Sequence, residues 1–411
     1  MGQALSKEEY SEPINYLDML HSDSKGWITK AEMNCGYKQW HYRYNELLEE
    51  EFKQENVYIS INTFYSTFRR LEYIKELKAQ FIDLDIYKTG FTKEQIIMQL
   101  EADYFNKSIP RPNLIIDSGR GLYLIWLINS VPSKALPLWK AVEEYLYSVL
   151  KPFGADRQAL DPTRILRVPG SINSKSKTKV QIVEQYDYVY DLREIQNNFL
   201  PELDESRPKK KGRPSKTVFI HRERSLYYAR IQDITKICEL RKYDLKGHRE
   251  LILFLYRYYL CSFLEDTEKA LQDVLELNRE FISPLRETEV IRATRSAERV
   301  YLSKKKEYKY KNKTLIELLD ITEFEETYMT TIISDKEYKR RQNKAFRKRY
   351  EEKLKADGKL TKREQINIQR QKIKALLEQG FTQKDISKEL NIPSRTIERR
   401  VKELRTLQEI V

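Results

Sequence analysis

The sequence has few of the side chains that build covalent cross-links or soft-metal centres. Its three cysteines (Cys35, Cys238 and Cys261) lie far apart, and its four histidines are scattered. An odd number of widely spaced cysteines argues against a disulfide framework, and no cysteine or histidine pair has zinc-ligand spacing. A G-x-x-x-x-G-K-[ST] motif is also missing, so we expect no P-loop ATPase motor in this chain.

Long apolar runs are missing as well. The two longest, 122–128 and 251–255, are far shorter than the ~20 residues that a bilayer-spanning helix needs. The first ten residues, MGQALSKEEY, have no secretory signal pattern. We therefore expect a soluble cytoplasmic protein with no membrane partner.

The chain nevertheless has the material for a folded core and carries a basic excess. Its 411 residues correspond to two or three domains, and 40% of them are hydrophobic and 11% aromatic. Lys and Arg number 75 against 62 Asp and Glu, which gives a net charge of +13. Such an excess favours a polyanionic partner, nucleic acid first. An AT-rich genome also produces many Lys, Ile and Tyr codons, so the charge is informative only where it clusters.

The pattern of apolar residues predicts an α+β domain over 1–203. Short β-rich runs occur at 80–87, 114–117, 122–128, 165–168 and 180–185, and a helical pattern covers 138–150. A Pro- and Lys-rich linker follows at 204–221, then a helical domain at 222–302. A charged helical connector spans 303–362, in which the run 336–350 is strongly basic. That run is either a solvated helix face or a binding surface. The last unit is 363–411.

Two carboxylates stand two residues apart in the apolar run QFIDLDIY. Strand periodicity places Asp83 and Asp85 on one face and the apolar residues on the other. Adjacent carboxylates repel each other, and a divalent cation such as Mg²⁺ or Mn²⁺ removes that conflict. The alternative is a strand edge whose two acids face water.

The second notable segment, LIIDSGRGLYLIWLI, reads as strand, tight turn, strand. Gly119 and Gly121 bracket Arg120, and glycine lets turn amides approach and surround an anion. Ser118 adds a hydroxyl and Arg120 a permanent charge, and both suit a phosphate. The alternative is an ordinary hairpin, in which glycine is expected anyway.

The third segment, GADRQALDPTRILRVPGSINSK, adds one more acid and two arginines. The acid is Asp161 or, as a second choice, Asp156, and Arg164 and Arg167 follow. Together the three segments supply three acids, a glycine turn and two arginines. These are the parts needed for metal-assisted phosphoryl transfer.

Three segments together resemble the three motifs of the archaeo-eukaryotic primase superfamily: FIDLD, SGRGLYLIW and ALDPTRILRVPGSINSK. The resemblance is closest to the replication proteins of Gram-positive plasmids and phages. The resemblance implies an α+β primase-polymerase core with an RRM-like catalytic sheet. It implies metal binding by Asp83, Asp85 and Asp161. It also implies nucleoside triphosphate binding by Ser118, Gly119, Arg120, Gly121, Tyr123, Arg164 and Arg167. Tyr123 departs from the pattern, since relatives commonly have His there.

The resemblance extends over residues 40–302, because GHRELILFLYRYYL and the residues after it look like the all-α domain that follows such cores. It implies single-stranded template DNA as a substrate. Since the chain has no P-loop, a replicative helicase is an expected partner. The sequence does not indicate an oligomeric state.

The C-terminal residues predict a trihelical helix-turn-helix. Helices are expected at 364–379, 382–390 and 395–404, with Thr382 and Ser394 as caps. Arg395, Thr396, Arg399 and Arg400 would then face a DNA major groove at a duplex origin. The stretch resembles the DNA-binding domains of resolvases and sigma-like regulators. The alternative is a three-helix packing module without DNA contact.

The linker KKKGRPSK resembles an AT-hook, in which Arg213 would enter an A·T minor groove; a merely basic linker is the alternative.

The leading hypothesis from all these segments is a plasmid or phage replication protein that binds origin DNA and synthesises primers. One rival is a catalytically weak or inactive initiator that recruits host replication enzymes. The other is a metal-dependent DxD glycosyltransferase.

Overall fold

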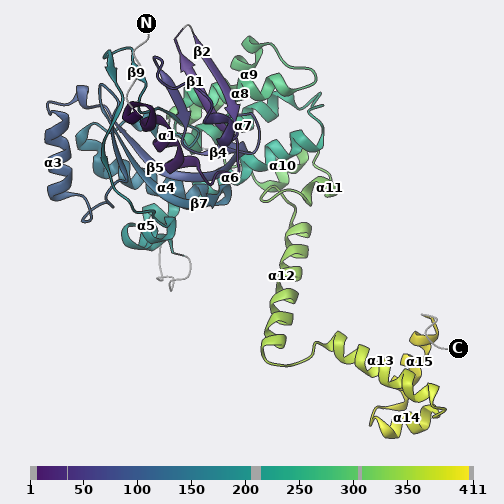
Figure 1. Ribbon diagram of the computed structural model, residues 1–411. Coiled ribbons are helices and arrows are strands. Elements are labelled where there is room, and N and C mark those ends of the chain that lie inside the picture. Colours follow the sequence, from purple (N-terminus) through teal and green to yellow (C-terminus); the bar gives the residue numbers. More distant parts are fainter. Residues whose placement is uncertain (1–6, 35, 205–213, 304–307, 407–411) are drawn as a thin grey trace. The chain divides into compact units, whose positions relative to one another are not determined.

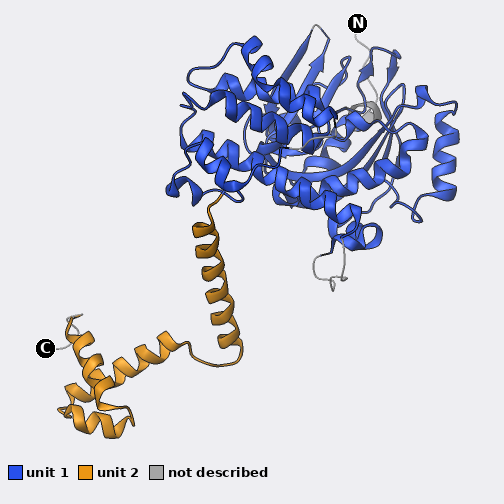
Figure 2. Cartoon of the chain, turned by 180° about the vertical axis from the view of Figure 1, so that it is seen from behind, with its two compact units in different colours: residues 1–332 blue, residues 333–411 orange. Residues whose placement is uncertain are grey.

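The computed structural model describes residues 7–34, 36–204, 214–303 and 308–406. The chain divides into two compact units, 1–332 and 333–411 (Figure 2). Arg213 of the predicted AT-hook lies outside the described residues. Among the helices that are described, none is both long and apolar enough to cross a membrane.

The first unit contains a five-stranded antiparallel sheet in the order β11-β6-β7-β5-β4 (Figure 1). Its strands are β4 (Thr63–Phe64), β5 (Ile74–Leu84), β6 (Leu114–Asp117), β7 (Leu122–Pro132) and β11 (Gln181–Gln185). β5 begins six residues before the predicted start at 80 and ends at Leu84 instead of 87. It ends there because residues 86–88 turn into a 3₁₀ helix, η2 (Ile86–Lys88).

A second antiparallel sheet has the order β2-β1-β3-β8, and a separate hairpin pairs β9 with β10. The strands are β1 (Ile28–Met33), β2 (Tyr37–Tyr42), β3 (Val57–Ser60), β8 (Ile165–Arg167), β9 (Ile172–Asn173) and β10 (Thr178–Lys179). The sequence did not predict β1 and β2. No residue of the edge strand β2 is fully buried, so it lacks the alternation of buried and exposed residues that marks a strand.

Helix α4 (Leu136–Leu150), expected at 138–150, packs on the five-stranded sheet. Trp139 Nε1 donates a hydrogen bond to the Ala79 carbonyl at 2.8 Å, and its ring lies 5.9 Å from that of Phe81. The other helices of this part are α1 (Lys7–His21), α2 (Tyr44–Leu47), α3 (Lys93–Asp103) and α5 (Leu192–Phe199).

The helices predicted as a domain at 222–302 share the first unit with the sheets. They are α6 (Lys216–Leu240), α7 (Arg249–Leu264), α8 (Thr267–Glu280) and α9 (Glu287–Ser303). Arg70, fully buried beside the sheet, pairs with Glu72 at 3.1 Å and with Glu280 of α8 at 2.5 Å. The Tyr256 hydroxyl of α7 donates to both Glu72 carboxylate oxygens at 2.9 Å. Buried charges therefore join the helices to the core.

The first unit continues past α9 to residue 332. Helices α10 (Asn312–Leu318) and α11 (Glu323–Glu326) belong to it. Asp233 of α6 accepts hydrogen bonds from the amides of Thr330, Thr331 and Ile332 at 2.5–2.8 Å. These bonds anchor the last residues of the unit, which the sequence had assigned to a connector.

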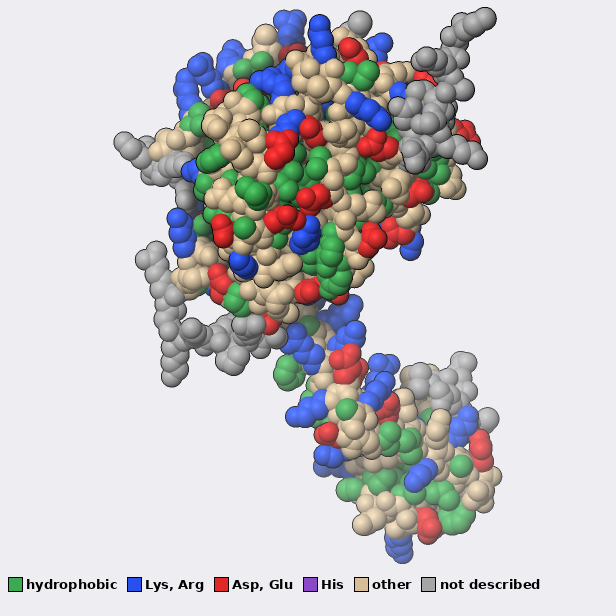
Figure 3. Space-filling view, turned by 60° about the vertical axis from the view of Figure 1, so that its left-hand side comes forward, with side chains coloured by type: hydrophobic (Ala, Val, Ile, Leu, Met, Phe, Trp, Pro, Cys, Tyr) green, Lys and Arg blue, Asp and Glu red, His purple; other side chains and the backbone are tan. Residues whose placement is uncertain are grey.

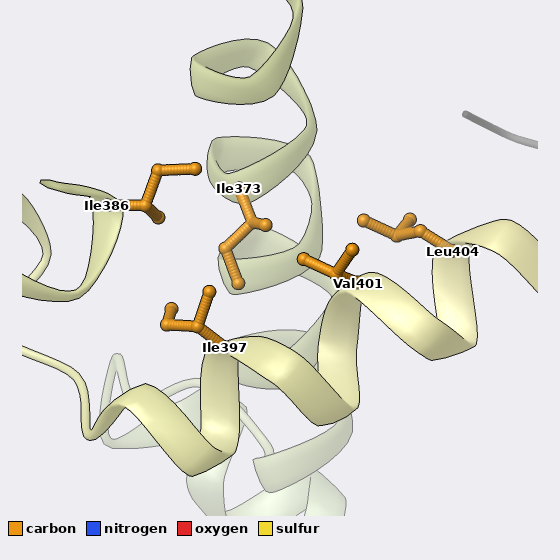
Figure 4. Packing of buried hydrophobic residues seen from close by; sticks show 5 residues of the cluster. All are labelled: Ile373, Ile386, Ile397, Val401 and Leu404. Carbon is orange, nitrogen blue, oxygen red and sulfur yellow. The ribbon is translucent and has the colours of Figure 1, made fainter. Parts of the chain in front are cut away.

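The second unit consists of α12 (Asp335–Ala356), α13 (Lys362–Glu378), α14 (Gln383–Glu389) and α15 (Ser394–Thr406). The last three helices lie within two residues of the predicted ranges. Gly380 has a φ of 86° directly after α13, and the Thr382 hydroxyl caps α14 by accepting from the Asp385 amide. Their buried core (Figure 4) is Ile373, Ile386, Ile397, Val401 and Leu404.

Candidate active site

The site is built around Asp83, the second-last residue of β5. On one side Asp83 is paired with Tyr123 of β7. On the other side residues 154–156 extend the sheet: the Asp85 amide donates to the Gly154 carbonyl, and the Asp156 amide donates to the Asp83 carbonyl, each at 2.8 Å. Leu84 and Ala155 form an antiparallel bridge between these bonds. Asp83 and Asp156 are therefore cross-strand neighbours, with Cβ atoms ~5 Å apart.

The predicted alternation along this run is present. Ile82, Leu84 and Ile86 are buried, whereas Asp83 and Asp85 are half-buried. Asp85 lies one residue beyond the strand, and its carboxylate accepts a hydrogen bond from Lys88 Nζ at 2.5 Å. The two acids therefore share a side of the chain, but only Asp83 belongs to the sheet.

Asp83 is poised between the neutral and the charged form. Burial raises the pKa of its carboxyl to about 7, and the negative charges of Asp85 and Asp156 add to this. Arg164 and Arg167 act in the opposite direction. A carboxyl that repels two others in a partly buried place is stabilised by a proton or by a metal cation.

Arg167 acts on Asp83 electrostatically and also contacts two tyrosines, Tyr123 and Tyr58. Its Nη1 lies 3.4 Å from the Tyr123 hydroxyl, and its guanidinium carbon lies 4.9 Å from the ring centre of Tyr58. Its Nε is buried and, within the described residues, has no hydrogen-bond acceptor. Because buried donors are normally paired, this nitrogen indicates a place for an anionic ligand.

The glycine turn lies against the end of β5. A Cβ on Gly121 would come within 2.0 Å of the Leu84 carbonyl oxygen, so only glycine allows this approach. The predicted amide concavity is not open, however. The Ser118 amide donates to the Gly121 carbonyl at 3.0 Å, and the Gly119 amide donates to the Asp117 carboxylate at 2.8 Å. Both amides are already used within the turn, as in an ordinary hairpin.

Arg120 is the residue of this turn that is presented to solvent. Its guanidinium lies 3.9 Å from the ring centre of Tyr87, which is itself exposed. Lys93 Nζ of α3 stabilises the turn by donating hydrogen bonds to the Asp117 carboxylate at 2.5 Å and to the Gly119 carbonyl at 2.9 Å. Sequence reasoning passed over Tyr58, Tyr87, Lys88 and Lys93, because nothing in their local pattern distinguishes them from ordinary surface or strand residues.

Asp161, the preferred third acid, lies elsewhere. Its carboxylate accepts hydrogen bonds from the Thr163 amide at 2.8 Å and the Thr163 hydroxyl at 2.8 Å and 2.9 Å. Burial alone would raise the pKa of Asp161, but Lys269 of α8 and the bonds from Thr163 outweigh it and hold this pKa below its usual range. The acid that the fold brings to Asp83 is Asp156, the second choice.

A divalent cation fits this donor set chemically. Asp83, Asp85 and Asp156 are hard oxygen ligands on two adjoining backbone segments. Burial, and then the charges of the other two acids, raise the pKa of Asp83. In the described parts of the chain, however, no three Asp, Glu, His or Cys side chains form a group that could hold a metal ion. Water and substrate phosphates commonly complete such coordination shells.

In the tail, Arg395 and Arg399 of α15 are exposed and Thr396 is half-buried. The expectation for Arg400 is not met. Its side chain is buried, and its Nη1 donates to Glu403 at 2.8 Å. Arg370 of α13 binds the same carboxylate at 2.6 Å. Arg400 therefore joins α15 to α13 instead of facing outwards.

Comparison with known proteins gives one similar sequence and one weakly similar structure. The chain is 67% identical over 388 residues to a protein from Clostridium perfringens described as a replication protein, covering 94% of this chain and 95% of that one. The AEP domain of the cyanophage S-2L primase-polymerase superposes with a TM-score of 0.34 and 16% identity, over 46% of this chain and 96% of the domain. No family model matches the chain.

Proposed function

This chain belongs to the family of the Clostridium perfringens replication protein, and we propose that it acts in DNA replication as a metal-dependent nucleotidyltransferase that synthesises primers. The observation that carries this proposal is the position of Asp83. It lies between Asp156, Asp85 and Tyr123, with a pKa raised to about 7 by burial and by like charges. Carboxyls whose pKa is raised by burial and like charges are enriched at functional sites, and three such acids side by side suit a metal cation.

Asp83, Asp85 and Asp156 would hold Mg²⁺ or Mn²⁺. When bound, the cation supplies positive charge that lowers the pKa of an attacking hydroxyl and neutralises the phosphate. The repulsion among the three acids supports this assignment.

The arginines would bind the triphosphate or the template backbone. Arg167 offers its buried, unpaired Nε, and Arg164 acts on Asp83 from the same side. Guanidinium groups suit phosphate oxygens because their donors form a planar fork. The Arg120 and Tyr87 pair offers an exposed flat surface on which a base can stack. Ser118 and Gly119 would act only by shaping the turn.

The last three helices would bind duplex origin DNA as a helix-turn-helix. Arg395, Thr396 and Arg399 lie on the side of α15 that is not buried, which supports their role at base edges or phosphates. Arg213 stays a prediction for the minor groove. A replicative helicase stays the expected partner.

A non-catalytic initiator is the second candidate, favoured by Tyr123. This residue is only 3% exposed, and its hydroxyl faces Arg167 rather than solvent. If Tyr123 serves packing alone, the site lacks the usual contact of motif two. The chain would then bind the origin and recruit host enzymes.

Incorporation of labelled nucleotides on single-stranded template with Mg²⁺ or Mn²⁺ separates the two candidates. Wild type should incorporate label, whereas Asp83→Asn and Asp85→Asn should not. Both variants should keep duplex binding, because the tail is a separate unit. A wild-type chain that binds origin DNA but incorporates nothing would favour the initiator.

A further inference from the structure

Helix α12, at the start of the second unit, carries an unusual charge and aromatic content. It has ten Lys and Arg against four Asp and Glu over 22 residues. Its aromatic side chains are open to solvent: Tyr338 is 52% exposed, Phe346 71% and Tyr350 56%. Neither the proposed catalysis nor the three-helix tail uses these residues. Blue Lys and Arg side chains are visible along this part of the chain in Figure 3.

The aromatic and basic residues share one face. At 100° per residue, Tyr338, Phe346 and Tyr350 fall within about 120° of the helix circumference. Three basic residues fall in the same sector, between the rings. The glutamates of α12 (Glu337, Glu351 and Glu352) fall outside this sector, whereas Asp335, the first residue of the helix, falls within it. The aromatic-basic face of α12 thus consists of Tyr338, Lys339, Phe346, Arg349, Tyr350 and Lys353.

Outside this face, two of the glutamates are paired with basic residues of the same helix. Glu337 accepts hydrogen bonds from Arg340 at 2.5 Å and 2.7 Å and pairs with Arg341 at 2.7 Å, and Glu352 lies 3.8 Å from Lys348. The aromatic-basic face itself has three basic residues against one acid, Asp335, so it keeps a positive potential.

We propose that the aromatic-basic face of α12 binds single-stranded nucleic acid. Proteins that hold single strands without sequence preference combine cations along the backbone with rings on which bases stack. Phe346 and Tyr350 are one helical turn apart, ~6 Å along the axis, so successive unpaired bases of one strand can reach both rings. Lys339, Arg349 and Lys353 lie beside the rings, where they meet the phosphates.

Charge and patterning argue against the other occupants of this face. A second copy of the helix would bring ten basic residues against ten, which is repulsive. A membrane surface requires a continuous apolar stripe, but basic residues interrupt the rings here. Duplex DNA buries its bases and would leave the three rings without stacking partners.

The test uses the full chain, without nucleotide, and measures anisotropy of labelled oligothymidine and of a blunt duplex of equal length. Phe346→Ala combined with Tyr350→Ala should weaken oligothymidine binding at least about fivefold and duplex binding much less. Phe346→Tyr with Tyr350→Phe keeps both rings and should bind as wild type. Phe346→Leu with Tyr350→Leu keeps apolar surface but should lose binding as the alanine pair does.

A charge-matched pair of variants tests the basic residues. Lys339→Gln with Arg349→Gln should flatten the salt dependence of oligothymidine binding, whereas Lys344→Gln with Lys355→Gln, on the opposite side, should change it less. Because α12 is exposed, circular dichroism should show unchanged helix content in all variants.

Wild-type oligothymidine affinity in the alanine pair overturns the proposal. The proposal is also overturned if the alanine pair loses affinity for duplex and for oligothymidine equally. The same holds if the alanine pair, unlike wild type, no longer forms a dimer or no longer binds anionic lipid vesicles. Binding is measured without catalysis, so the outcome is independent of whether Asp83 supports nucleotidyl transfer.

Discussion

Asp83 and Tyr123 face each other across β5 and β7, and Arg167 interacts with both. Burial, followed by the nearby Asp83 charge, raises the pKa of Tyr123, so its hydroxyl remains a proton donor at neutral pH. Arg167 in turn favours the ionised form of Asp83. The two residues therefore form one electrostatic unit, in which a change at either position alters the other.

Tyr123→Phe removes the hydroxyl but keeps the ring that packs on the sheet. We expect a several-fold loss in kcat/KM for nucleotide incorporation, since one neutral hydrogen bond contributes about 1 kcal/mol. Thermal stability should change little. Tyr123→His should retain activity if an imidazole reaches the phosphate. Unchanged kinetics in Tyr123→Phe, with a lower Tm in Tyr123→His, would assign Tyr123 to packing and favour the initiator.

The pKa of Asp83 predicts how stability depends on pH. The folded chain holds this proton to about pH 7, whereas the unfolded chain releases it near 3.8. Between these values the folded state binds more protons, so the free energy of unfolding falls as pH rises. Asp83→Asn should remove this slope and be more stable than wild type at pH 8, by about 1–2 kcal/mol because the carboxyl is half-buried. Urea denaturation at several pH values measures the difference.

The same carboxylates predict stabilisation by metal. Mg²⁺ or Mn²⁺ bound only to the folded chain should raise the Tm of wild type at pH 8. The rise should shrink at pH 6, where Asp83 is protonated, and should be small in Asp83→Asn. An equal rise in wild type and variant would place the metal elsewhere.

Alanine variants of Asp156 and Asp161 test which of the two is the third acid of the site. Asp156→Ala should abolish incorporation with little change in stability, because its side chain is half-buried beside Asp83. Asp161→Ala should lower stability by about 1–3 kcal/mol, because it leaves buried donors of Thr163 unpaired. Incorporation by the folded Asp161→Ala variant should persist. The reverse result would restore Asp161 to the site.

The Arg70 cluster predicts that sheet and helices unfold together. Arg70→Met leaves Glu72 and Glu280 without their partner in a buried place and should cost about 3–5 kcal/mol. Arg279→Ala is the control, because its pair with Glu287 is exposed and should contribute less than about 1 kcal/mol. Similar losses in both variants would contradict the role of Arg70.

In the tail, Arg399 and Arg400 should behave differently. Arg399→Ala should weaken origin binding by about 1–3 kcal/mol if it contacts a base edge, with little change in folding. Arg400→Ala should instead lower the stability of the three helices, since it removes the contact with Glu403. Electrophoretic mobility shifts and thermal melts distinguish the two effects.

Local signals in the sequence were sufficient for several elements. The strand Leu114–Asp117 has the predicted bounds, and the alternation around Asp83 is present because it depends only on the two-residue strand repeat. Helix α14 begins after the predicted cap Thr382, whose hydroxyl accepts a hydrogen bond from the Asp385 amide of the first turn. Ser394, the other predicted cap, is instead the first residue of α15, and its hydroxyl lies 3.1 Å from that of Ser387. Such features involve neighbours in the chain and are therefore readable without the fold.

Other features depend on tertiary contacts: the position of Asp156, the burial of Arg400 and the packing of the helices of 222–302. The position of Asp156 beside Asp83 depends on the pairing of residues 154–156 with the end of β5, about 70 residues earlier in the chain. The Arg400 side chain is buried where α15 packs on α13, and there Glu403 accepts hydrogen bonds from both Arg370 and Arg400. The helices of 222–302 joined the core through Arg70 and Glu280. The bonds between residues 154–156 and β5, and the Arg370–Glu403 and Arg70–Glu280 pairs, each join residues that are far apart in the chain. Periodicity and composition carry no record of such contacts.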